Sequence, residues 1–156
     1  MVDRPVPGCT APGFSVAGGE TLLTAAGVGT DLLAVGRIKE AYERHSERLV
    51  KRLLTPAEQQ AFSQHPDPIN YLAKAFSAKE ALAKALGTGI ASGVSFQDFS
   101  IQRDRAGKPL VHVSGRAEEI MRSVDERAQL LLSLSDDDGW IQAFSVLALV
   151  PDASSN

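Results

Sequence analysis

The sequence predicts an α+β fold with a mainly antiparallel sheet. Segments with the periods of strands and helices follow one another in the order strand, three helices, two strands, helix, two strands. Short turn sequences at 105–109 and 136–139 join successive strands, which is typical of antiparallel hairpins. With 156 residues, 44% of them hydrophobic, the chain suits one domain with an ordinary core. These observations together indicate the α+β class.

The two ends of the chain are predicted to lie outside the folded domain. Residues 1–20 are rich in proline and glycine and have no periodicity, so we expect a loose N-terminal extension. The single domain should cover residues 21–150 and leave 151–156 as a tail. Its first strand should begin near Thr21 and lead into Gly29-Thr30-Asp31.

Three helices are predicted next. An apolar stripe indicates a helix over 35–54, and Thr55-Pro56-Ala57-Glu58 has the pattern of a capping box that begins a short helix ending near Phe62. A longer helix should run over 69–86. Its apolar face has Glu80 at its middle, and Gly87 follows as the expected end.

The second half of the chain has mainly strand periodicity. Short strands are expected at 94–96 and 99–101, with a slip in phase at Asp98, and at 110–113. A helix over 116–128 should follow. Strands at 130–135 and 140–150 should form a hairpin around Asp136-Asp137-Asp138-Gly139.

Composition limits the possible functions. The net charge of -3 argues against general nucleic-acid binding. No apolar run is long enough for a membrane span, and no signal peptide is apparent. A single cysteine, Cys9, excludes an internal disulfide and a Cys-rich zinc site. We therefore expect a cytoplasmic protein without nucleic-acid or membrane partners.

The segment from Arg37 to Arg52 is basic in a chain that is acidic overall. Six basic and three acidic residues leave it with a charge of +3. It is either a solvated helix face with ion pairs, such as Glu40–Arg44 and Glu47–Lys51, or a docking surface for an acidic partner. Charge alone favours the solvated face.

Asp31 and Glu80 are the residues that point to chemistry. A carboxylate on an apolar helix face is costly if it stays charged and unpaired. Glu80 could pair with Lys84, remain protonated or bind a cation, and Asp31 could cap a helix. Taken together, two hard oxygen ligands would suit Mg²⁺ beside a phosphate. Lys79 and Lys84 could then neutralise phosphate charge, and the backbone at 87–89 could approach an anion.

Several motifs of this chain resemble those of the holo-acyl-carrier-protein synthases. They are Gly27-Val28-Gly29-Thr30-Asp31, Arg37-Ile38, the run 72–90 containing Lys79-Glu80-Ala81 and Lys84, Gly107-Lys108-Pro109, and Ser133-Leu134-Ser135. The likeness covers about residues 26–150. It implies the 4′-phosphopantetheinyl transferase-like fold, in which an antiparallel sheet packs against a long helix.

The resemblance implies an Mg²⁺-dependent 4′-phosphopantetheinyl transferase. Such enzymes move phosphopantetheine from coenzyme A to a serine of apo acyl carrier protein and release adenosine 3′,5′-bisphosphate. They are typically homotrimers with active sites between subunits. The residue roles that carry over are metal ligation by Asp31 and Glu80; catalysis by Glu80, Lys84 and Asp136; coenzyme A contacts from Lys79, Lys84, Gly87, Lys108, Pro109 and Ser135; and carrier-protein contacts from Arg37, Arg44 and Arg48.

Three positions depart from the commoner family pattern. Ala34 stands where a Glu is usual, Ala75 where an Arg is frequent, and Asp136 where a His often follows Ser-Leu-Ser. The proton acceptor for the carrier serine therefore stays open, with a metal-bound water or a carboxylate as alternatives. A non-catalytic carrier-protein or coenzyme A-binding module is the alternative function. Retention of the two carboxylates and Lys84 argues against such a module.

Overall fold

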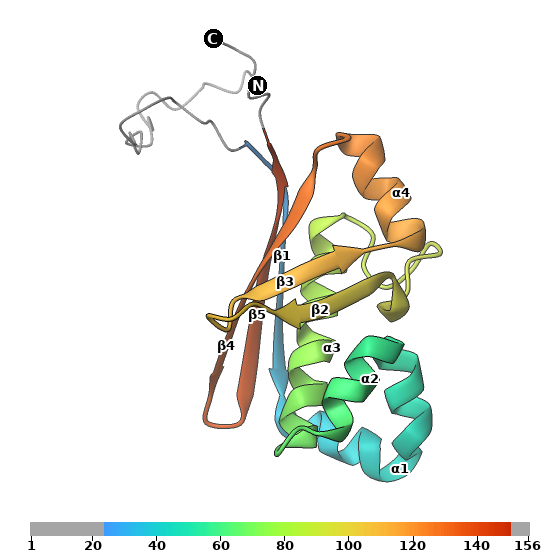
Figure 1. Cartoon of the computed structure of the whole chain (residues 1–156), viewed down its shortest axis with the longest axis vertical. Helices are drawn as coiled ribbons and strands as arrows, with labels where there is room; N and C mark the ends of the chain where they lie inside the picture. Colours follow the sequence, from blue (N-terminus) through green and yellow to red (C-terminus); the bar gives the residue numbers. More distant parts are fainter. Residues whose placement is uncertain (1–23, 151–156) are drawn as a thin grey trace, which may run out of the picture.

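The computed structural model describes residues 24–150. The predicted extension 1–20, the first residues of the predicted domain and the tail 151–156 lie outside this range. The predicted α+β class is confirmed (Figure 1). The elements in chain order are β1 (Thr24–Ala34), α1 (Val35–Leu53), α2 (Pro56–Ser63), α3 (Pro68–Ala85), the 3-10 turn η1 (Phe96–Asp98), β2 (Phe99–Arg103), β3 (Pro109–Val113), α4 (Gly115–Val124), β4 (Gln129–Asp137) and β5 (Trp140–Leu149).

The main sheet has three antiparallel strands in the order β1-β5-β4. Ala143 on the central strand is opposite Asp31 on one side and Leu134 on the other, so these three residues form one row across the sheet. β2 and β3 form a separate antiparallel hairpin. Among residues 24–150, β1 and β4 are therefore the edge strands of this sheet, with Asp31 on β1 and Ser135 and Asp136 on β4.

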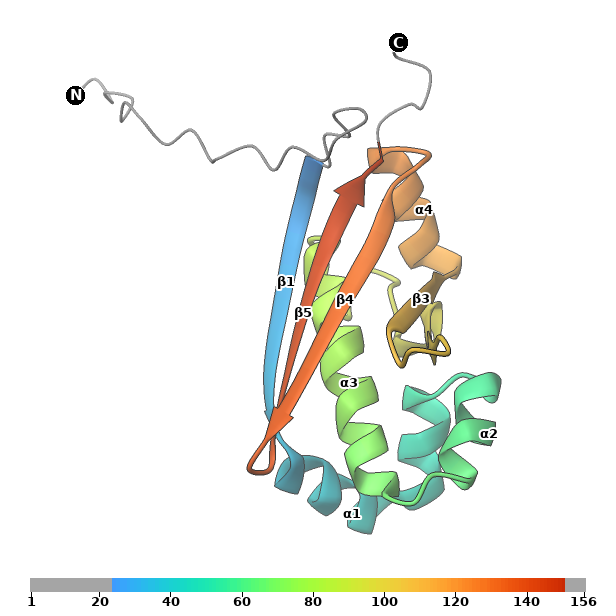
Figure 2. The ribbon, with the colours of Figure 1, turned by 60° about the vertical axis from the view of Figure 1, so that its left-hand side comes forward.

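The long helix α3 covers one face of the main sheet. Figures 1 and 2 show it lying along the strands, with the β2–β3 hairpin and α4 near its C-terminal end and α1 and α2 near its N-terminal end. Most of its buried residues are small alanines, which allow neighbouring elements to approach closely. Two core clusters lie along it, one around Leu82 and Phe99 and the other around Leu72 and Leu54.

The capping signals read from the sequence are correct for α2. The Thr55 side chain accepts a hydrogen bond from the backbone N–H of Glu58, and the Glu58 carboxylate accepts one from the backbone N–H of Thr55. The α3 helix begins in a related way, because Asp67 Oδ1 accepts a hydrogen bond from the N–H of Asn70. Local chemistry therefore fixes where both helices start.

Two predicted elements differ from the structure. The segment 94–96 is not a strand, because Phe96 begins a 3-10 turn and is buried in the core, and β2 starts only at Phe99. The phase slip predicted at Asp98 marks this turn. Helix α4 ends at Val124, before the predicted residue 128, because Asp125 is extended and its carboxylate accepts from the N–H of Arg127.

Helix α1 is also not one continuous helix. Ser46 has φ 37° and ψ −115°, outside the helical region, so the helix is broken into the parts 35–45 and 47–53. Figure 1 shows the second part turning to run beside α2. Among residues 24–150, no helix is long and apolar enough to cross a membrane.

Candidate active site

Tertiary structure brings Asp31, Glu80 and Lys84 together at the β1 edge of α3. Lys84 Nζ donates to Asp31 Oδ1 at 3.2 Å and to the carbonyl oxygen of Thr30 at 2.9 Å. The sequence left open a pair between Glu80 and Lys84. The structure instead pairs Lys84 with Asp31, and no Glu80–Lys84 ion pair forms in the described part of the chain.

Two glycines of β1 make this approach possible. A Cβ atom at Gly29 would lie 2.0 Å from the carbonyl oxygen of Ala81, and one at Gly27 would lie 2.1 Å from that of Ala85. No side chain fits at such distances, so β1 can lie against α3 only with glycine at both positions. The motif Gly27-Val28-Gly29 thus sets the contact that brings Asp31 beside Lys84.

The site has more negative charge than its own cation can balance. Asp31 Oδ2 is buried and has no hydrogen-bond partner within residues 24–150. Burial raises the pKa of Glu80 above its ordinary value, the nearby Asp31 carboxylate raises this pKa further, and Lys84 partly opposes both effects. An unpaired carboxylate oxygen beside a second, desolvated carboxylate is an arrangement that a cation would stabilise.

The donor set fits Mg²⁺. Two carboxylates provide hard oxygen ligands, and Mg²⁺ commonly takes one or two carboxylates and fills its other positions with water and substrate phosphate. In the described range, no cluster of three or more His, Cys, Asp or Glu side chains could form a cage made only of protein ligands. A cation held here would keep positions open for a substrate.

Most of the chain, including these three residues, matches a known family. A model of the 4′-phosphopantetheinyl transferase superfamily matches residues 27–140, a span that includes Asp31, Glu80 and Lys84. The chain belongs to this superfamily.

Individual relatives agree with this assignment. The holo-[acyl-carrier-protein] synthase of Yersinia enterocolitica is 42% identical over 111 residues, 71% of this chain and 87% of that protein. The crystal structure of the Neisseria meningitidis synthase has a TM-score of 0.73 and 39% identity, covering 80% of this chain and 98% of that one. The Helicobacter pylori synthase in complex with coenzyme A has a TM-score of 0.66 and 30% identity over 77% and 98% of the two chains. The predicted family, fold and enzyme class are confirmed.

The other predicted catalytic residue of the transferase lies elsewhere in the chain. Asp136 is on β4, at the opposite edge of the sheet from Asp31, and its Oδ2 pairs with Lys74 Nζ at 3.1 Å. Ser135 is its neighbour on β4, and Lys108 and Pro109 lie at the tip of the β2–β3 hairpin. One chain therefore holds two separate groups of predicted site residues.

Lys79 does not lie where the sequence placed it. Its side chain is fully buried, and its ammonium donates to Glu58 Oε2 at 2.6 Å and to the carbonyl oxygen of Leu53 at 2.7 Å. Burial lowers the pKa of Lys79, while the Glu58 carboxylate raises it. An ammonium enclosed in this way is not available to a coenzyme A phosphate. The expectation from sequence failed because the partner, Glu58, belongs to another helix.

The backbone N–H groups after α3 are already hydrogen-bonded within the protein, contrary to the expected anion-binding loop. Gly87 and Gly89 have positive φ values of 82° and 61° and end the helix. The Gly87 N–H donates to the carbonyl of Lys84, and the N–H groups of Thr88 and Gly89 donate to that of Ala83. These N–H groups serve the helix end, so the backbone does not form an open anion cradle. A substrate contact at Gly87 stays a prediction.

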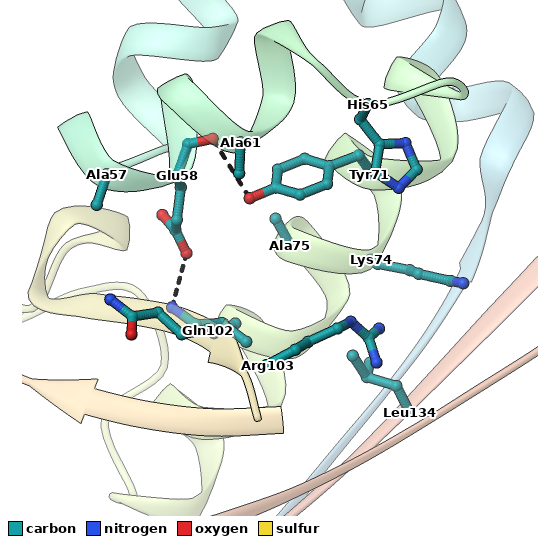
Figure 3. Close-up of a pocket in the computed structure, with 11 residues that line it drawn as sticks. Ala57, Glu58, Ala61, His65, Tyr71, Lys74, Ala75, Gln102, Arg103 and Leu134 are labelled. Atoms are coloured by element: carbon teal, nitrogen blue, oxygen red, sulfur yellow. Dashed lines mark hydrogen bonds between the residues drawn. The ribbon is translucent and has the colours of Figure 1, made fainter. Parts of the chain in front are cut away.

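A cavity that the sequence did not indicate opens between α2, α3, β2 and β4. It has a volume of about 470 Å³. Figure 3 shows Lys74, Arg103, His65 and Tyr71 around it, with Ala57, Ala61, Ala75 and Leu134 completing much of the wall. Burial raises the pKa of Tyr71 to about 12, so its hydroxyl is neutral and donates to the carbonyl of Glu58 at 3.3 Å. Arg103 ends β2, two residues beyond the predicted strand 99–101, and no sequence pattern indicated the cavity beside it.

The basic helix α1 carries both of the predicted ion pairs. Arg44 lies 3.9 Å from Glu40 and Lys51 lies 3.6 Å from Glu47, with all four side chains mostly exposed. Arg37 and Arg48 are also exposed, and neither forms an ion pair with a residue in the range 24–150. The ion pairs agree with a solvated helix face, and docking of an acidic partner on this helix stays a prediction.

Proposed function

We propose that this chain transfers 4′-phosphopantetheine from coenzyme A to a serine of apo acyl carrier protein, with Mg²⁺ bound by Asp31 and Glu80. One observation carries the proposal: the buried, unpartnered Asp31 Oδ2 lies in the same site as Glu80, whose pKa is raised. The names of the relatives from Yersinia and Neisseria and the coenzyme A bound to the Helicobacter protein support this substrate pair.

The reaction joins the carrier serine to the phosphopantetheine phosphorus. The serine oxygen forms a new bond to that phosphorus, the bond from phosphorus to the bridging oxygen breaks, and adenosine 3′,5′-bisphosphate leaves with the bond electrons. Mg²⁺ held by the two carboxylates would lower the charge barrier to attack on the diphosphate. Lys84 is half-exposed beside Asp31, so its ammonium can turn toward a phosphate oxygen and balance charge that develops there.

The proton of the carrier serine must pass to a base. Asp136 is the carboxylate proposed for this step. Its side chain is half-exposed and therefore accessible, and its Oδ2 lies beside Lys74. Because Asp136 lies on the sheet edge opposite Asp31, it would have to act in the site of a neighbouring chain.

A homotrimer would bring the two groups of residues together. The sheet face away from α3 has exposed apolar side chains that no residue of 24–150 covers: Val28 and Leu32 are each 62% exposed, Phe144 48% and Leu131 41%. These side chains come from all three strands and lie within adjacent cross-strand rows. Figure 2 shows that α3 covers only the other face. Such a patch is typical of a subunit interface, and contact through it would allow active sites to be shared between chains.

Coenzyme A would bind on the β4 side of each such site. The cavity in Figure 3 borders Leu134, the neighbour of Ser135, and Arg103, the last residue of β2, which pairs with Pro109 at the tip of the hairpin. Apolar walls with Lys74 and Arg103 suit a phosphorylated nucleoside. Ala75, where an Arg is frequent in the family, also lines this cavity, and its small side chain leaves room there. Arg103 provides a positive charge in the same cavity.

The acidic carrier protein would dock on α1 through Arg37, Arg44 and Arg48. All three are exposed on a helix that follows directly from the strand carrying Asp31. Changing Arg37 and Arg44 to Glu should raise the KM for the carrier protein much more than the KM for coenzyme A, because only the carrier meets this surface. An equal rise in both KM values would favour the interpretation of α1 as a solvated helix face with ion pairs.

The transfer itself is tested by mass spectrometry. The protein is incubated with several apo carrier proteins and coenzyme A, with Mg²⁺ or with a chelator. We expect a phosphopantetheine adduct on the carrier that requires Mg²⁺. The absence of an adduct on every carrier would reject the proposed function and favour a non-catalytic binding module.

The trimer has its own test in analytical ultracentrifugation. Changing both Val28 and Phe144 to Asp should give a monomer and abolish transfer, because it separates Asp31 of one chain from Asp136 of the next. Changing Leu110 to Asp is the matched control. Leu110 is 42% exposed on β3, outside this face. A monomeric wild-type protein with full activity would contradict the shared site.

A further inference from the structure

Lys79 is the immediate chain neighbour of Glu80, yet it serves a different purpose. Its ammonium has no exposed surface and bonds both to Glu58 on α2 and to the carbonyl oxygen of Leu53, the last residue of α1. A charge is rarely buried so completely unless its partners are fixed. Lys79 therefore connects the helix that carries Glu80 with the end of the basic helix.

Glu58 extends this connection to a fourth element. Its Oε1 accepts from the N–H of Ile101 on β2 at 2.8 Å, a bond drawn in Figure 3. Its Oε2 accepts from Lys79 and from the N–H of Thr55, 2.8 Å away. Both oxygens are thus occupied. One buried ion pair joins α1, α2, α3 and β2.

The break in α1 means that this connection can set the direction of residues 47–53. At Ser46 the backbone leaves the helical region, so the part 47–53 does not inherit its direction from the part 35–45 through continuous helical hydrogen bonds. Its direction must come from tertiary contacts. Its last carbonyls are held from outside: Gln97 Nε2 donates to that of Lys51 at 2.8 Å, and Lys79 donates to that of Leu53 at 2.7 Å.

We infer that the buried Glu58–Lys79 pair positions the second part of α1, and with it Arg48, relative to the carboxylates of the active site. This inference rests on the proposed docking of a carrier protein on α1. Lys79 and Glu58 are positioning residues, since their side chains are 0% and 2% exposed and their polar atoms bond to the protein. An error in the direction of residues 47–53 would misplace Arg48 while leaving Asp31, Glu80 and Lys84 in place.

An apolar substitute would not reproduce this role. Replacing a buried ion pair with uncharged side chains is often tolerated by the fold, whereas removing one partner leaves a charge buried without a counterion. The bond to the Leu53 carbonyl needs a donor at the end of a long side chain, which methionine lacks. A double variant that removes both charges can therefore fold and still lose the fixed direction of residues 47–53.

The informative variant is Glu58→Gln combined with Lys79→Met. We expect it to fold and to raise the KM for the carrier protein about 10-fold, because docking is misaligned. This rise should exceed any change in the KM for coenzyme A, whose proposed cavity Glu58 borders. A role limited to stability would leave the carrier KM unchanged once the variant is folded at the assay temperature. That result would overturn the inference.

Arg48→Ala and Arg37→Ala sharpen the test as a matched pair. In the wild-type background both should raise the KM for the carrier protein. In the double variant, Arg37→Ala should keep its effect because it lies before the break, whereas Arg48→Ala should lose most of its effect because Arg48 is already misplaced. An unchanged effect of Arg48→Ala in the double variant contradicts the inference.

Hydrogen exchange separates a failure of this inference from a failure of the proposed function. In the double variant, backbone amides of residues 47–53 should exchange faster while those of 35–45 do not change. This readout needs no activity. If the wild-type protein transfers nothing, the proposed function fails but the positioning role is still measured. Unchanged exchange at 47–53 would reject the positioning role even in an active enzyme.

Discussion

Two lysines of α3 each pair with a carboxylate from another element, but one pair is buried and the other is partly exposed. Lys79 and Glu58 are 2.6 Å apart, with side chains 0% and 2% exposed. Lys84 and Asp31 are 3.2 Å apart, with side chains 46% and 15% exposed. Every oxygen of Glu58 has a partner, whereas Asp31 Oδ2 has none among the residues described.

The difference shows where a ligand can act. The closed pair is almost completely enclosed by protein, so it can only hold elements together. The open pair has an unused oxygen, a half-exposed ammonium and a second carboxylate, Glu80, with a raised pKa. Neighbouring positions on one helix thus divide into a structural role and the proposed catalytic one, because one side of the helix faces the core and the other faces the edge of the sheet.

The largest expected effect comes from removing one carboxylate from each region. Glu58→Ala leaves the Lys79 ammonium buried and unpaired, which should cost about 3–5 kcal/mol of unfolding free energy. Glu80→Ala should change stability by less than about 1 kcal/mol but lower the transfer rate about 100- to 1,000-fold. Urea unfolding and the transfer assay measure the two losses. A nearly fully active Glu80→Ala variant would show that the metal assignment is wrong.

The close approach of β1 and α3 should be the next most sensitive feature. Gly29→Ala places a Cβ atom 2.0 Å from the Ala81 carbonyl oxygen, and relieving that overlap should cost about 1–3 kcal/mol. The variant should also lose transfer activity, because Asp31 moves away from Lys84. Gly36→Ala on α1 is the control, since its Cβ meets nothing within 4 Å. Equal melting temperatures for the two variants would contradict this account.

Mg²⁺ should distinguish the open region by stabilising the folded protein. At 100 times its dissociation constant a ligand adds about 2.7 kcal/mol, and the rise in Tm should be much smaller in Glu80→Gln. The raised pKa of Glu80 means that the metal-free native state binds this proton more tightly than the unfolded chain does. The contribution of Glu80 to stability should therefore increase as the pH falls toward its ordinary pKa of 4.5 and diminish as the pH rises. The opposite slope of Tm against pH, taken as the difference between wild type and Glu80→Gln, would exclude a desolvated Glu80.

The smallest effect is expected for an exposed pair. Arg44 and Glu40 are 3.9 Å apart, and their side chains are 69% and 72% exposed. Arg44→Ala should change the unfolding free energy by less than about 0.5 kcal/mol, because solvent screens such pairs. Urea unfolding measures this change, and Lys51→Ala, which removes the second exposed ion pair, should give a similarly small one. A loss as large as that of Glu58→Ala would mean that exposure does not separate these pairs.

Much of the fold was predictable because its signals are local. The order of elements and the start of α2 follow from periodicity and from the Thr55–Glu58 capping box. The break at Ser46 was missed because no glycine or proline marks it. The strand predicted at 94–96 was wrong because an aromatic residue such as Phe96 packs equally well from a turn.

The candidate site divides in the same way. The sequence by itself determined which residue types the chain offers: two carboxylates, Asp31 and Glu80, in a family motif with Lys84. Only the tertiary structure decided their partners. In the folded protein Lys84 pairs with Asp31, Lys79 is buried in an ion pair with Glu58, and Arg103 lines a cavity. The physical reason is that periodicity fixes the face of an element on which a side chain lies, whereas an ion pair between elements depends on how closely they pack, and here two glycines of β1 set that distance.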